Sequence, residues 1–157
     1  MNEVGLIGMG VMGSNLVLNI YDNYSKKISC FDIDQKKQDN FKYENLDKKE
    51  IIQFSNLQKF VESITKPRKI IILIPSGKYV DSLLSNLLPI LDKNDNLLDG
   101  GNEWYKNSEM RINKCKSLNI NYLACGISGG EEGARNGPCV MCGGDKKAYD
   151  QFKIILE

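Results

Sequence analysis

A glycine-rich hexapeptide, GMGVMG at residues 8–13, is the first stretch of the sequence with a composition suited to ligand binding. It follows the apolar run Val4–Ile7 and precedes an amphipathic segment, so a strand, a turn and a helix are expected in that order. In such a turn Gly8 permits a tight bend, Gly10 lets the backbone approach a pyrophosphate, and Gly13 lets the helix lie close to the strand. Because the amides and the positive dipole end of that helix favour an anion, the pattern predicts a dinucleotide site.

An acidic residue, Asp32, ends the next apolar run, about 20 residues after Gly13. A carboxylate at this place accepts hydrogen bonds from the adenosine ribose hydroxyls, which favours NAD. NADP would bring a 2′-phosphate close to Asp32 and Asp34, and each pair of like charges about 5 Å apart repels by about 3 kcal/mol at an effective dielectric of about 20. Lys36 and Lys37 offset only part of this repulsion.

A second glycine-containing stretch, DGGNEWY at Asp99–Tyr105, follows the predicted strand NLLD. Ligands of doubly wound sheets bind at the carboxyl ends of the strands, so this loop is expected to face cofactor and substrate. Gly100 and Gly101 permit close backbone approach, and the Asn102 side chain offers both a donor and an acceptor.

A third stretch, GISGGEEGARNG at Gly126–Gly137, follows the predicted strand INYLAC and is expected to form a glycine-rich loop. Ser128, Gly129 and Gly130 present a hydroxyl and unobstructed backbone amides. Such groups suit an anionic or polyhydroxylated ligand.

Together, four runs resemble the 6-phosphogluconate dehydrogenases in order and spacing: GLIGMGVMGSNL, KPRKIIILIPSG, LLDGGNEWY and GISGGEEGARNGPCVMCGG. The resemblance covers essentially the whole chain, and its later two runs are much more specific than the first, which other β-hydroxyacid dehydrogenases share. It implies that the cofactor is bound by Gly8, Met9, Gly10, Val11, Met12, Gly13, Ser14, Asp32, Ile33, Asp34, Ile74, Pro75, Ser76 and Asn102. It also implies that 6-phosphogluconate is bound by Asn102, Ser128, Gly129 and Gly130.

The reaction implied by the resemblance is hydride transfer from C3 of 6-phosphogluconate to NADP, followed by loss of CO₂ to give ribulose 5-phosphate, without a metal. In the family a lysine base and a glutamate acid drive these steps, and both lie beyond residue 157, as does a helical second domain that supplies most of the dimer contact. Residues 1–157 are therefore expected to be a dinucleotide-binding domain that contains no catalytic residue and does not turn over substrate alone, while the full-length protein is expected to be a homodimer.

Three positions depart from the family pattern. Asp32, Ile33 and Asp34 stand where NADP-using members usually carry Asn-Arg-Thr, Pro75 stands where many carry lysine, and Cys142 replaces a proline. The resemblance thus implies NADP, whereas these residues favour NAD. Two alternatives stay open: a diverged, non-catalytic relative that binds a nucleotide or sugar phosphate, and another β-hydroxyacid dehydrogenase.

The composition narrows the range of partners. Lysine plus arginine number 21 and aspartate plus glutamate 20, so the charge gives no reason to expect nucleic acid or an anionic membrane surface. No apolar run is long enough to span a bilayer and the N-terminus lacks a secretion signal, so a cytoplasmic protein is expected.

Histidine is absent from the chain, which excludes Ser-His-Asp and Cys-His catalysis within it. The five cysteines are expected to be reduced thiols. Cys139 and Cys142 form a C-x-x-C pair, but a zinc site would need a second pair or histidines.

The elements that must position these residues alternate between strand and helix along the chain. Strands are predicted at Val4–Ile7, Ile28–Asp32, Ile51–Phe54, Lys69–Ile74, Asn96–Asp99, Ile120–Cys125 and Cys139–Cys142. Helices are predicted at Val11–Tyr21, Gln35–Tyr43, Val80–Leu91 with an interruption at Pro89, Ser108–Leu118 and from Asp145 onward. A further helix is predicted to begin after a cap at Ser55 or Asn56 and to contain Leu57, Phe60, Val61 and Ile64. This order predicts an α/β fold, a doubly wound Rossmann-type sheet that is mostly parallel with helices on both faces. The chain stops within its last predicted helix, so a longer protein is expected to continue from it.

Overall fold

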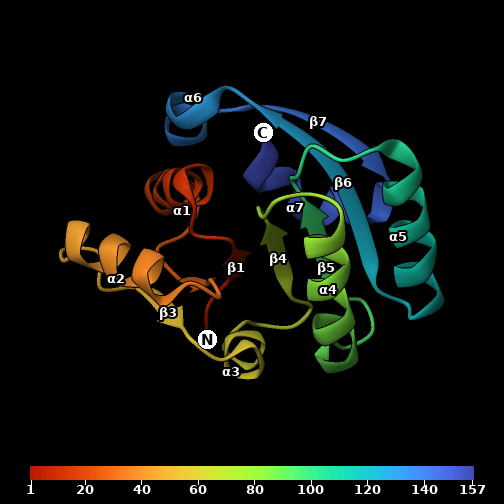
Figure 1. Ribbon diagram of the computed structural model, residues 1–157, viewed down its shortest axis with the longest axis horizontal. Helices are drawn as coiled ribbons and strands as arrows, with labels where there is room; N and C mark the ends of the chain where they lie inside the picture. The colour runs from red at the N-terminus through yellow and green to blue at the C-terminus, as the bar shows by residue number, and fades with distance from the viewer.

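The computed structural model describes all 157 residues and contains one seven-stranded sheet with helices on both faces (Figure 1). The strands are β1 (Val4–Ile7), β2 (Ile28–Phe31), β3 (Ile51–Phe54), β4 (Lys69–Ile72), β5 (Asn96–Asp99), β6 (Asn121–Ser128) and β7 (Cys139–Gly144). Their order across the sheet is β3-β2-β1-β4-β5-β6-β7, and every neighbouring pair is parallel except β6–β7. The predicted doubly wound fold is confirmed.

Two apolar clusters, one on each face of the sheet, hold the helices in place. The helices are α1 (Val11–Asn23), α2 (Gln35–Glu44), α3 (Leu57–Glu62), α4 (Lys78–Leu87), α5 (Tyr105–Ser117), α6 (Gly130–Asn136) and α7 (Lys146–Leu156). Buried residues of α1, α2, α6 and α7 share one cluster, and those of α3, α4 and α5 share the other. None of these helices combines the length and the apolar character needed to cross a membrane.

The apolar patterns place most elements where the sequence predicts them. The β-branched run of β4 is buried, as expected of a strand covered on both faces. Val80, Leu84 and Leu87 turn one face of α4 into the core, and a 3₁₀ turn at Leu88–Ile90 marks the predicted interruption at Pro89. Asn56 is the cap of α3, with its side chain accepting a hydrogen bond from the Lys59 amide.

Strand β4 ends at Ile72, two residues earlier than the sequence predicts. Its neighbour β1 stops at Ile7 because Gly8 turns away with φ +106°. The Leu73 amide still donates to the Ile7 carbonyl at 2.8 Å, but beyond it β4 has no strand partner on that side and Pro75 has no N–H to donate. Ile74 therefore belongs to the loop that follows β4.

The prediction of a glycine-rich loop at Gly126–Gly137 is wrong. Strand β6 continues to Ser128 because antiparallel β7 pairs with it to that residue, and the short helix α6 follows. Helix α6 packs on α1, as Figure 1 shows, where Asn19 Nδ2 donates to the Ala134 carbonyl at 3.2 Å and Arg135 pairs with Asp22 at 2.6 Å. A sequence pattern rich in glycine does not reveal these two tertiary contacts.

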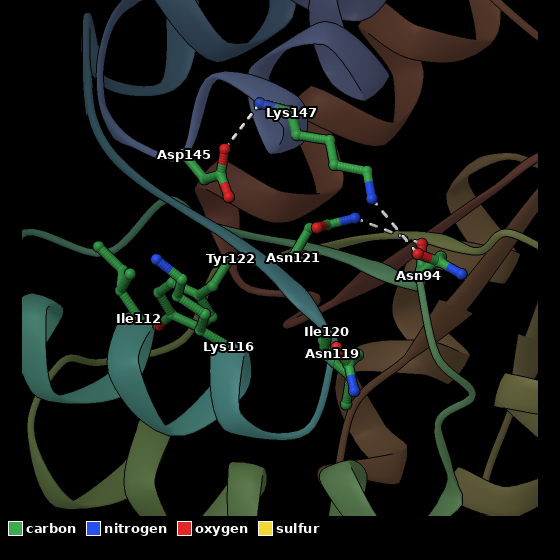
Figure 2. Close-up of a pocket in the computed structure, with 9 residues that line it drawn as sticks. All are labelled: Asn94, Ile112, Lys116, Asn119, Ile120, Asn121, Tyr122, Asp145 and Lys147. Carbon is green, nitrogen blue, oxygen red and sulfur yellow. Dashed lines mark hydrogen bonds between the residues drawn. The ribbon is translucent and has the colours of Figure 1, made fainter.

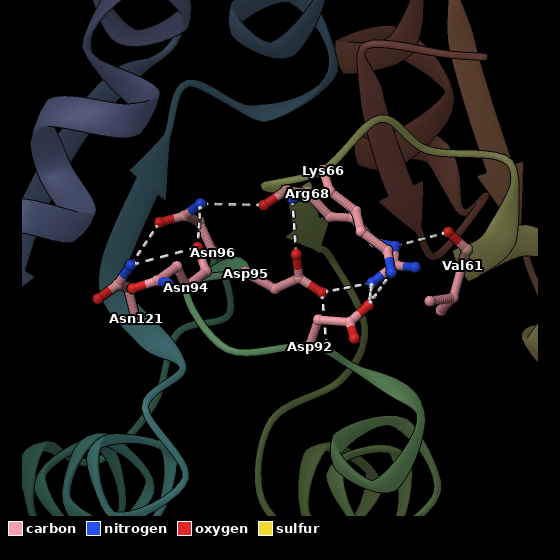
Figure 3. A network of polar contacts seen from close by, with 8 residues as sticks. All are labelled: Val61, Lys66, Arg68, Asp92, Asn94, Asp95, Asn96 and Asn121. Atoms are coloured by element: carbon pink, nitrogen blue, oxygen red, sulfur yellow. Dashed lines mark hydrogen bonds and ion pairs between the residues drawn. The ribbon is translucent and has the colours of Figure 1, made fainter.

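An ion-pair network, buried at Arg68 and Asp95 and partly exposed at Asp92, joins the amino ends of β4 and β5 (Figure 3). Arg68 Nη1 lies 2.6 Å from Asp95 Oδ2 and 2.7 Å from Asp92 Oδ2, and the Arg68 amide donates to Asp95 Oδ1. Asn96 Nδ2 donates to the Arg68 carbonyl. The carboxylate of Asp95 is fully buried, and a buried carboxylate with three donors is well compensated for its lost hydration. This network lies at the amino edge of the sheet, opposite the predicted ligand site, and holds β4 and β5 together there.

Candidate functional site

The predicted site residues follow five adjacent strands at one edge of the sheet. Because these strands are parallel and neighbours, their carboxyl ends lie in a row in the order β2, β1, β4, β5, β6. The corresponding segments, in that order, are Asp32–Asp34, Gly8–Ser14, Ile74–Ser76, Asn102 and Ser128–Gly130. With strands about 4.8 Å apart, the row spans about 19 Å across the sheet, and β6 runs four residues past the end of β5 before it reaches Ser128. The glycine loop lies where the chain's crossovers change direction, between β1 and β4, which is where doubly wound sheets bind their ligands.

Two glycines of the GMGVMG loop are required by the fold itself. Gly8 has φ +106°, and a Cβ there would lie 2.2 Å from the Leu73 carbonyl oxygen. A Cβ at Gly13 would lie 1.8 Å from the Gly8 carbonyl oxygen, so α1 can pack on the turn only because Gly13 has no side chain. The roles predicted for these two residues in turn and helix packing are confirmed.

Gly10 is different, because a Cβ built on it meets nothing within 4 Å. Its backbone, with φ −72° and ψ −176°, is open to any residue. Gly10 is the N-cap of α1 and no side chain caps that helix end, so the first amides of α1 face the open edge. The space above Gly10 therefore fits an anionic group that approaches the backbone closely.

The Asp32 carboxylate holds the glycine loop in place. Its Oδ2 accepts a hydrogen bond from the Met9 amide at 2.7 Å and its Oδ1 accepts one from the Asp34 amide at 2.8 Å. The residue is 8% exposed. The sequence predicts only a ribose contact for Asp32, and these two backbone contacts are an additional role that spacing alone could not indicate.

The two residues after Asp32 are the exposed part of this segment. Ile33 is 95% exposed and projects from the turn between β2 and α2. Asp34 is exposed as well and caps α2, with Oδ1 accepting from the Lys36 amide at 3.0 Å. No cation stands at either position, so the surface at the β2 end of the row carries an apolar and an acidic side chain.

A buried guanidinium joins the loops that follow β4 and β5. Arg111, on α5, is 2% exposed; its Nη1 donates to Glu103 Oε2 at 2.6 Å and its Nη2 to the Gly77 carbonyl at 3.0 Å. The Gly77 amide donates to the same Glu103 oxygen at 2.7 Å. A third bond, from Arg111 Nε to Asp81 Oδ1, ties in the first turn of α4. These contacts fix the position of Asn102, the residue before Glu103.

The hydrogen bonds between Arg111, Gly77 and Glu103, called here the Arg111–Glu103 clamp, help to lower the pKa of the Glu103 carboxyl. Burial alone would raise the pKa, but hydrogen bonds from the Asn107 side chain, the Gly77 amide, the Arg111 guanidinium and the Trp104 amide outweigh it and lower the pKa to about 2. Glu103 is therefore ionised at neutral pH and serves the loop as an acceptor.

Asp99 in the same motif is also turned inward. Its Oδ2 accepts from Tyr122 Oη at 2.6 Å and lies 3.5 Å from Arg111 Nη1, and its Oδ1 accepts from the Gly101 amide at 3.1 Å. Burial and the neighbouring carboxylate raise the pKa of Tyr122, which keeps its hydroxyl protonated as the donor. Sequence reasoning missed both Arg111 and Tyr122, because nothing in a helix or strand pattern marks which charged or phenolic side chain is buried.

Gly100 packs closely against the end of β6. A Cβ there would lie 2.6 Å from Ile127 Cδ1, the tip of a flexible side chain, so a larger residue would need Ile127 to shift. Asn102, by contrast, is exposed, and it lines a hollow of about 350 Å³ together with Gly101, Ser108 and Gly126.

The remaining predicted residues flank Asn102 on both sides. Ile74 is half-buried, and Pro75 and Ser76 are exposed on the loop after β4. Ser128, Gly129 and Gly130 are exposed at the end of β6, and Gly129 and Gly130 have φ +128° and +60°. Their binding roles stay predictions, but all of them lie on the same edge with their surfaces accessible.

A smaller hollow of about 150 Å³ lies at the opposite, amino edge of the sheet (Figure 2). It is lined by Asn94 before β5, Lys116 of α5, Asn121 at the start of β6 and Lys147 at the start of α7, among others. Lys147 Nζ already donates to Asn94 Oδ1 at 3.4 Å. None of the residues singled out in the sequence for binding lies there.

Comparison with known proteins agrees with the motifs. A family model described as the NAD binding domain of 6-phosphogluconate dehydrogenase matches residues 3–157. Two Bacillus subtilis proteins, the NAD(+)-dependent and the NADP(+)-dependent decarboxylating 6-phosphogluconate dehydrogenases, are 40% and 39% identical to the chain over 155 residues, each match covering 99% of it. A solved structure of Plasmodium falciparum 6-phosphogluconate dehydrogenase, described with its cofactor NADP+ and its substrate 6-phosphogluconate, is 42% identical with a TM-score of 0.93 over 99% of the chain. The chain spans 33% of the length of each of these three proteins.

Two glycine substitutions should separate folding from binding. Gly13→Ala forces a Cβ into the Gly8 carbonyl and is expected to lower the free energy of unfolding by about 2 kcal/mol or more. Gly10→Ala is expected to change it by less than about 1 kcal/mol, the scale of an N-cap change, while weakening dinucleotide affinity at least tenfold, or about 1.4 kcal/mol. Urea unfolding and fluorescence titration with NADH measure the two effects, and unchanged NADH affinity in Gly10→Ala would contradict the role of the open space.

Removing the charge of Glu103 should change how the stability of the fold depends on pH. Because its pKa is about 2 in the folded chain and 4.5 as the reference value, the ionised carboxylate stabilises the fold fully above about pH 4.5, and this stabilisation is lost as the pH falls toward 2. Glu103→Gln is expected to cost about 2 kcal/mol at neutral pH, with the difference from the unsubstituted chain shrinking below pH 4.5. Urea unfolding across this range measures it, with Glu109→Gln on the exposed side of α5 as the matched control. A difference that is constant with pH would contradict the assignment.

Proposed function

Because the chain belongs to the 6-phosphogluconate dehydrogenase family, we propose that it binds a nicotinamide dinucleotide along the carboxyl edge of its sheet and presents the nicotinamide to 6-phosphogluconate. The observation that carries this proposal is the order of the five segments on that edge, from Asp32–Asp34 through the glycine loop to Asn102 and Ser128–Gly130. An extended dinucleotide would follow the row, with adenosine beside β2 and nicotinamide toward β5.

The residues of this chain have distinct tasks in that arrangement. The open space above Gly10 and the first amides of α1 take the pyrophosphate, while Asp32 holds the loop through the Met9 amide. Ile74, Pro75 and Ser76 line the cleft beyond it. When bound, the nicotinamide accepts a hydride from C3 of the substrate, and the resulting 3-keto acid loses CO₂ to give ribulose 5-phosphate.

The substrate would lie against the neighbouring strand ends. Asn102, held by the Arg111–Glu103 clamp, offers a donor and an acceptor at the junction of nicotinamide and substrate. Ser128, Gly129 and Gly130 offer a hydroxyl and backbone amides to a polyhydroxylated, phosphorylated ligand. The Plasmodium falciparum relative is described with 6-phosphogluconate as its substrate, which supports this class of ligand.

We propose further that residues 1–157 form one dinucleotide-binding domain that does not turn over substrate alone. Glu103 follows Asn102 in the sequence, and with a pKa of about 2 its carboxylate is poorly matched to proton transfer at neutral pH. A lysine base and a glutamate acid would come from a helical second domain in the remaining two thirds of a protein as long as its relatives. Such a full-length protein would be a cytoplasmic homodimer.

The cofactor preference that we propose is NAD. Asp32 and Asp34 bring two carboxylates to the place where NADP carries its 2′-phosphate, and Ile33 offers no charge to offset them. At about 5 Å and an effective dielectric of about 20, each carboxylate–phosphate pair would cost about 3 kcal/mol before salt screening. The relatives include both an NAD(+)-dependent and an NADP(+)-dependent enzyme at nearly the same identity, so this preference rests on the residues of the turn.

Fluorescence titration of the chain with NADH and with NADPH tests this proposal. The expected result is saturable binding of NADH that is at least as tight as that of NADPH. Binding of neither dinucleotide would contradict the function, and NADPH binding more than tenfold tighter, or about 1.4 kcal/mol, would contradict the preference.

An arginine introduced at the exposed position of the turn should reverse the preference. Ile33→Arg is expected to tighten NADPH binding at least tenfold with little change for NADH, because a guanidinium pairs bidentately with a phosphate. Tyr43→Arg, also at an exposed site but near the end of α2, adds the same charge away from the turn and serves as the matched control.

A further inference from the structure

Two cysteines that are far apart in the sequence face each other across the β6–β7 pair. Cys125 and Cys142 are direct partners in the antiparallel register, and their sulfur atoms lie 3.2 Å apart, with the Cys125 thiol donating to Cys142. Direct partners in antiparallel strands have Cα atoms about 4.5–5.5 Å apart. This separation lies within the range that a disulfide spans, so the bond can form without a shift in strand register.

The C-x-x-C pair in the sequence is not the pair that the fold brings together. Residues three apart on a strand point to opposite faces of the sheet, so Cys139 and Cys142 on β7 point away from each other. Cys139 is instead opposite Ser128. Cys142 and Cys125 lie on the same face, where Cys125 packs in the cluster with α7.

The two thiols also differ in accessibility, which determines which of them reacts first. Cys142 is exposed at the edge strand and can meet a reagent from solution, whereas Cys125 is 3% exposed. Burial and the contact with Cys142 raise the pKa of Cys125, so Cys125 is a protonated thiol. A reagent therefore meets Cys142 first and Cys125 second.

We propose that Cys125 and Cys142 form a reversible disulfide site that is oxidised by a low-molecular-weight disulfide such as glutathione disulfide. The Cys142 thiolate attacks one sulfur of the reagent, forms a mixed disulfide and releases one reagent thiolate. The Cys125 sulfur then attacks the Cys142 sulfur, loses its proton to the solvent and displaces the second reagent thiolate. The two protein thiols lose two electrons in total, and the reagent is reduced to two thiols.

The bond would close the segment that carries part of the proposed substrate site. Residues 126–141 contain Ser128–Gly130 and helix α6, and they lie between the two sulfurs. A cross-link at the base of this segment restricts its local opening, because the chain ends that enter and leave it are tied together. This proposal concerns the thiols alone and does not rest on the dinucleotide function.

The test is oxidation of the folded chain by glutathione disulfide, followed by intact mass measurement and non-reducing peptide mapping. We expect a transient mixed disulfide, then loss of two hydrogen atoms with residues 125 and 142 linked in one peptide pair. Hydrogen exchange should slow across residues 126–141, and dithiothreitol should restore the original exchange rates.

Single substitutions make the result specific. Cys142→Ser is expected to abolish the internal bond and the slowed exchange, whereas Cys139→Ser, the other exposed cysteine on β7, should leave both unchanged. Oxidation that stops at mixed disulfides, a link between Cys139 and Cys142, or cross-linking only between molecules would overturn the proposal. The same reaction in urea, where all five cysteines are accessible, gives the scrambled pattern for comparison.

Discussion

The contact between the Cα of Gly13 and the carbonyl oxygen of Gly8 is the constraint on which the rest of the site depends. It leaves no room for a side chain, and so it sets α1 directly on the turn that follows β1. The first amides of that helix consequently face the edge of the sheet beside Gly10, where a Cβ would meet nothing. A dipole aimed at an open space beside a parallel sheet is the physical basis for binding a pyrophosphate.

Buried charges then hold the neighbouring loops around that space. Asp32 accepts from the Met9 amide and thereby links the end of β2 to the glycine loop. On the other side Arg111 and Glu103 link the loops after β4 and β5, which leaves Asn102 exposed between them. The Arg111–Glu103 pair is costly to break because both side chains are buried, so it restrains the two loops that it joins.

The fold and the edge of the sheet that carries the candidate site could be predicted from the sequence. The alternation of apolar runs and amphipathic segments gave the parallel sheet, and the sheet placed every predicted binding segment on one edge. Contacts that depend on tertiary structure could not be predicted: the burial of Arg111, the packing of Ile127 against Gly100, and the docking of α6 on α1. The glycine-rich composition of Gly126–Gly137 predicts a loop. In the structure its first residues belong to β6 because they pair with β7, and most of the rest form α6, which packs on α1.

The most direct test of the central claim is an amide NMR titration of the chain with NAD⁺, which reports every backbone N–H separately. Binding along the carboxyl edge predicts the largest shift changes at residues 9–14, followed by residues 32–34 and by Ile74 and Ser76. Shift changes concentrated instead around Asn94, Lys116 and Lys147, in the hollow at the amino edge, would contradict it. So would a spectrum that NAD⁺ and NADH both leave unchanged.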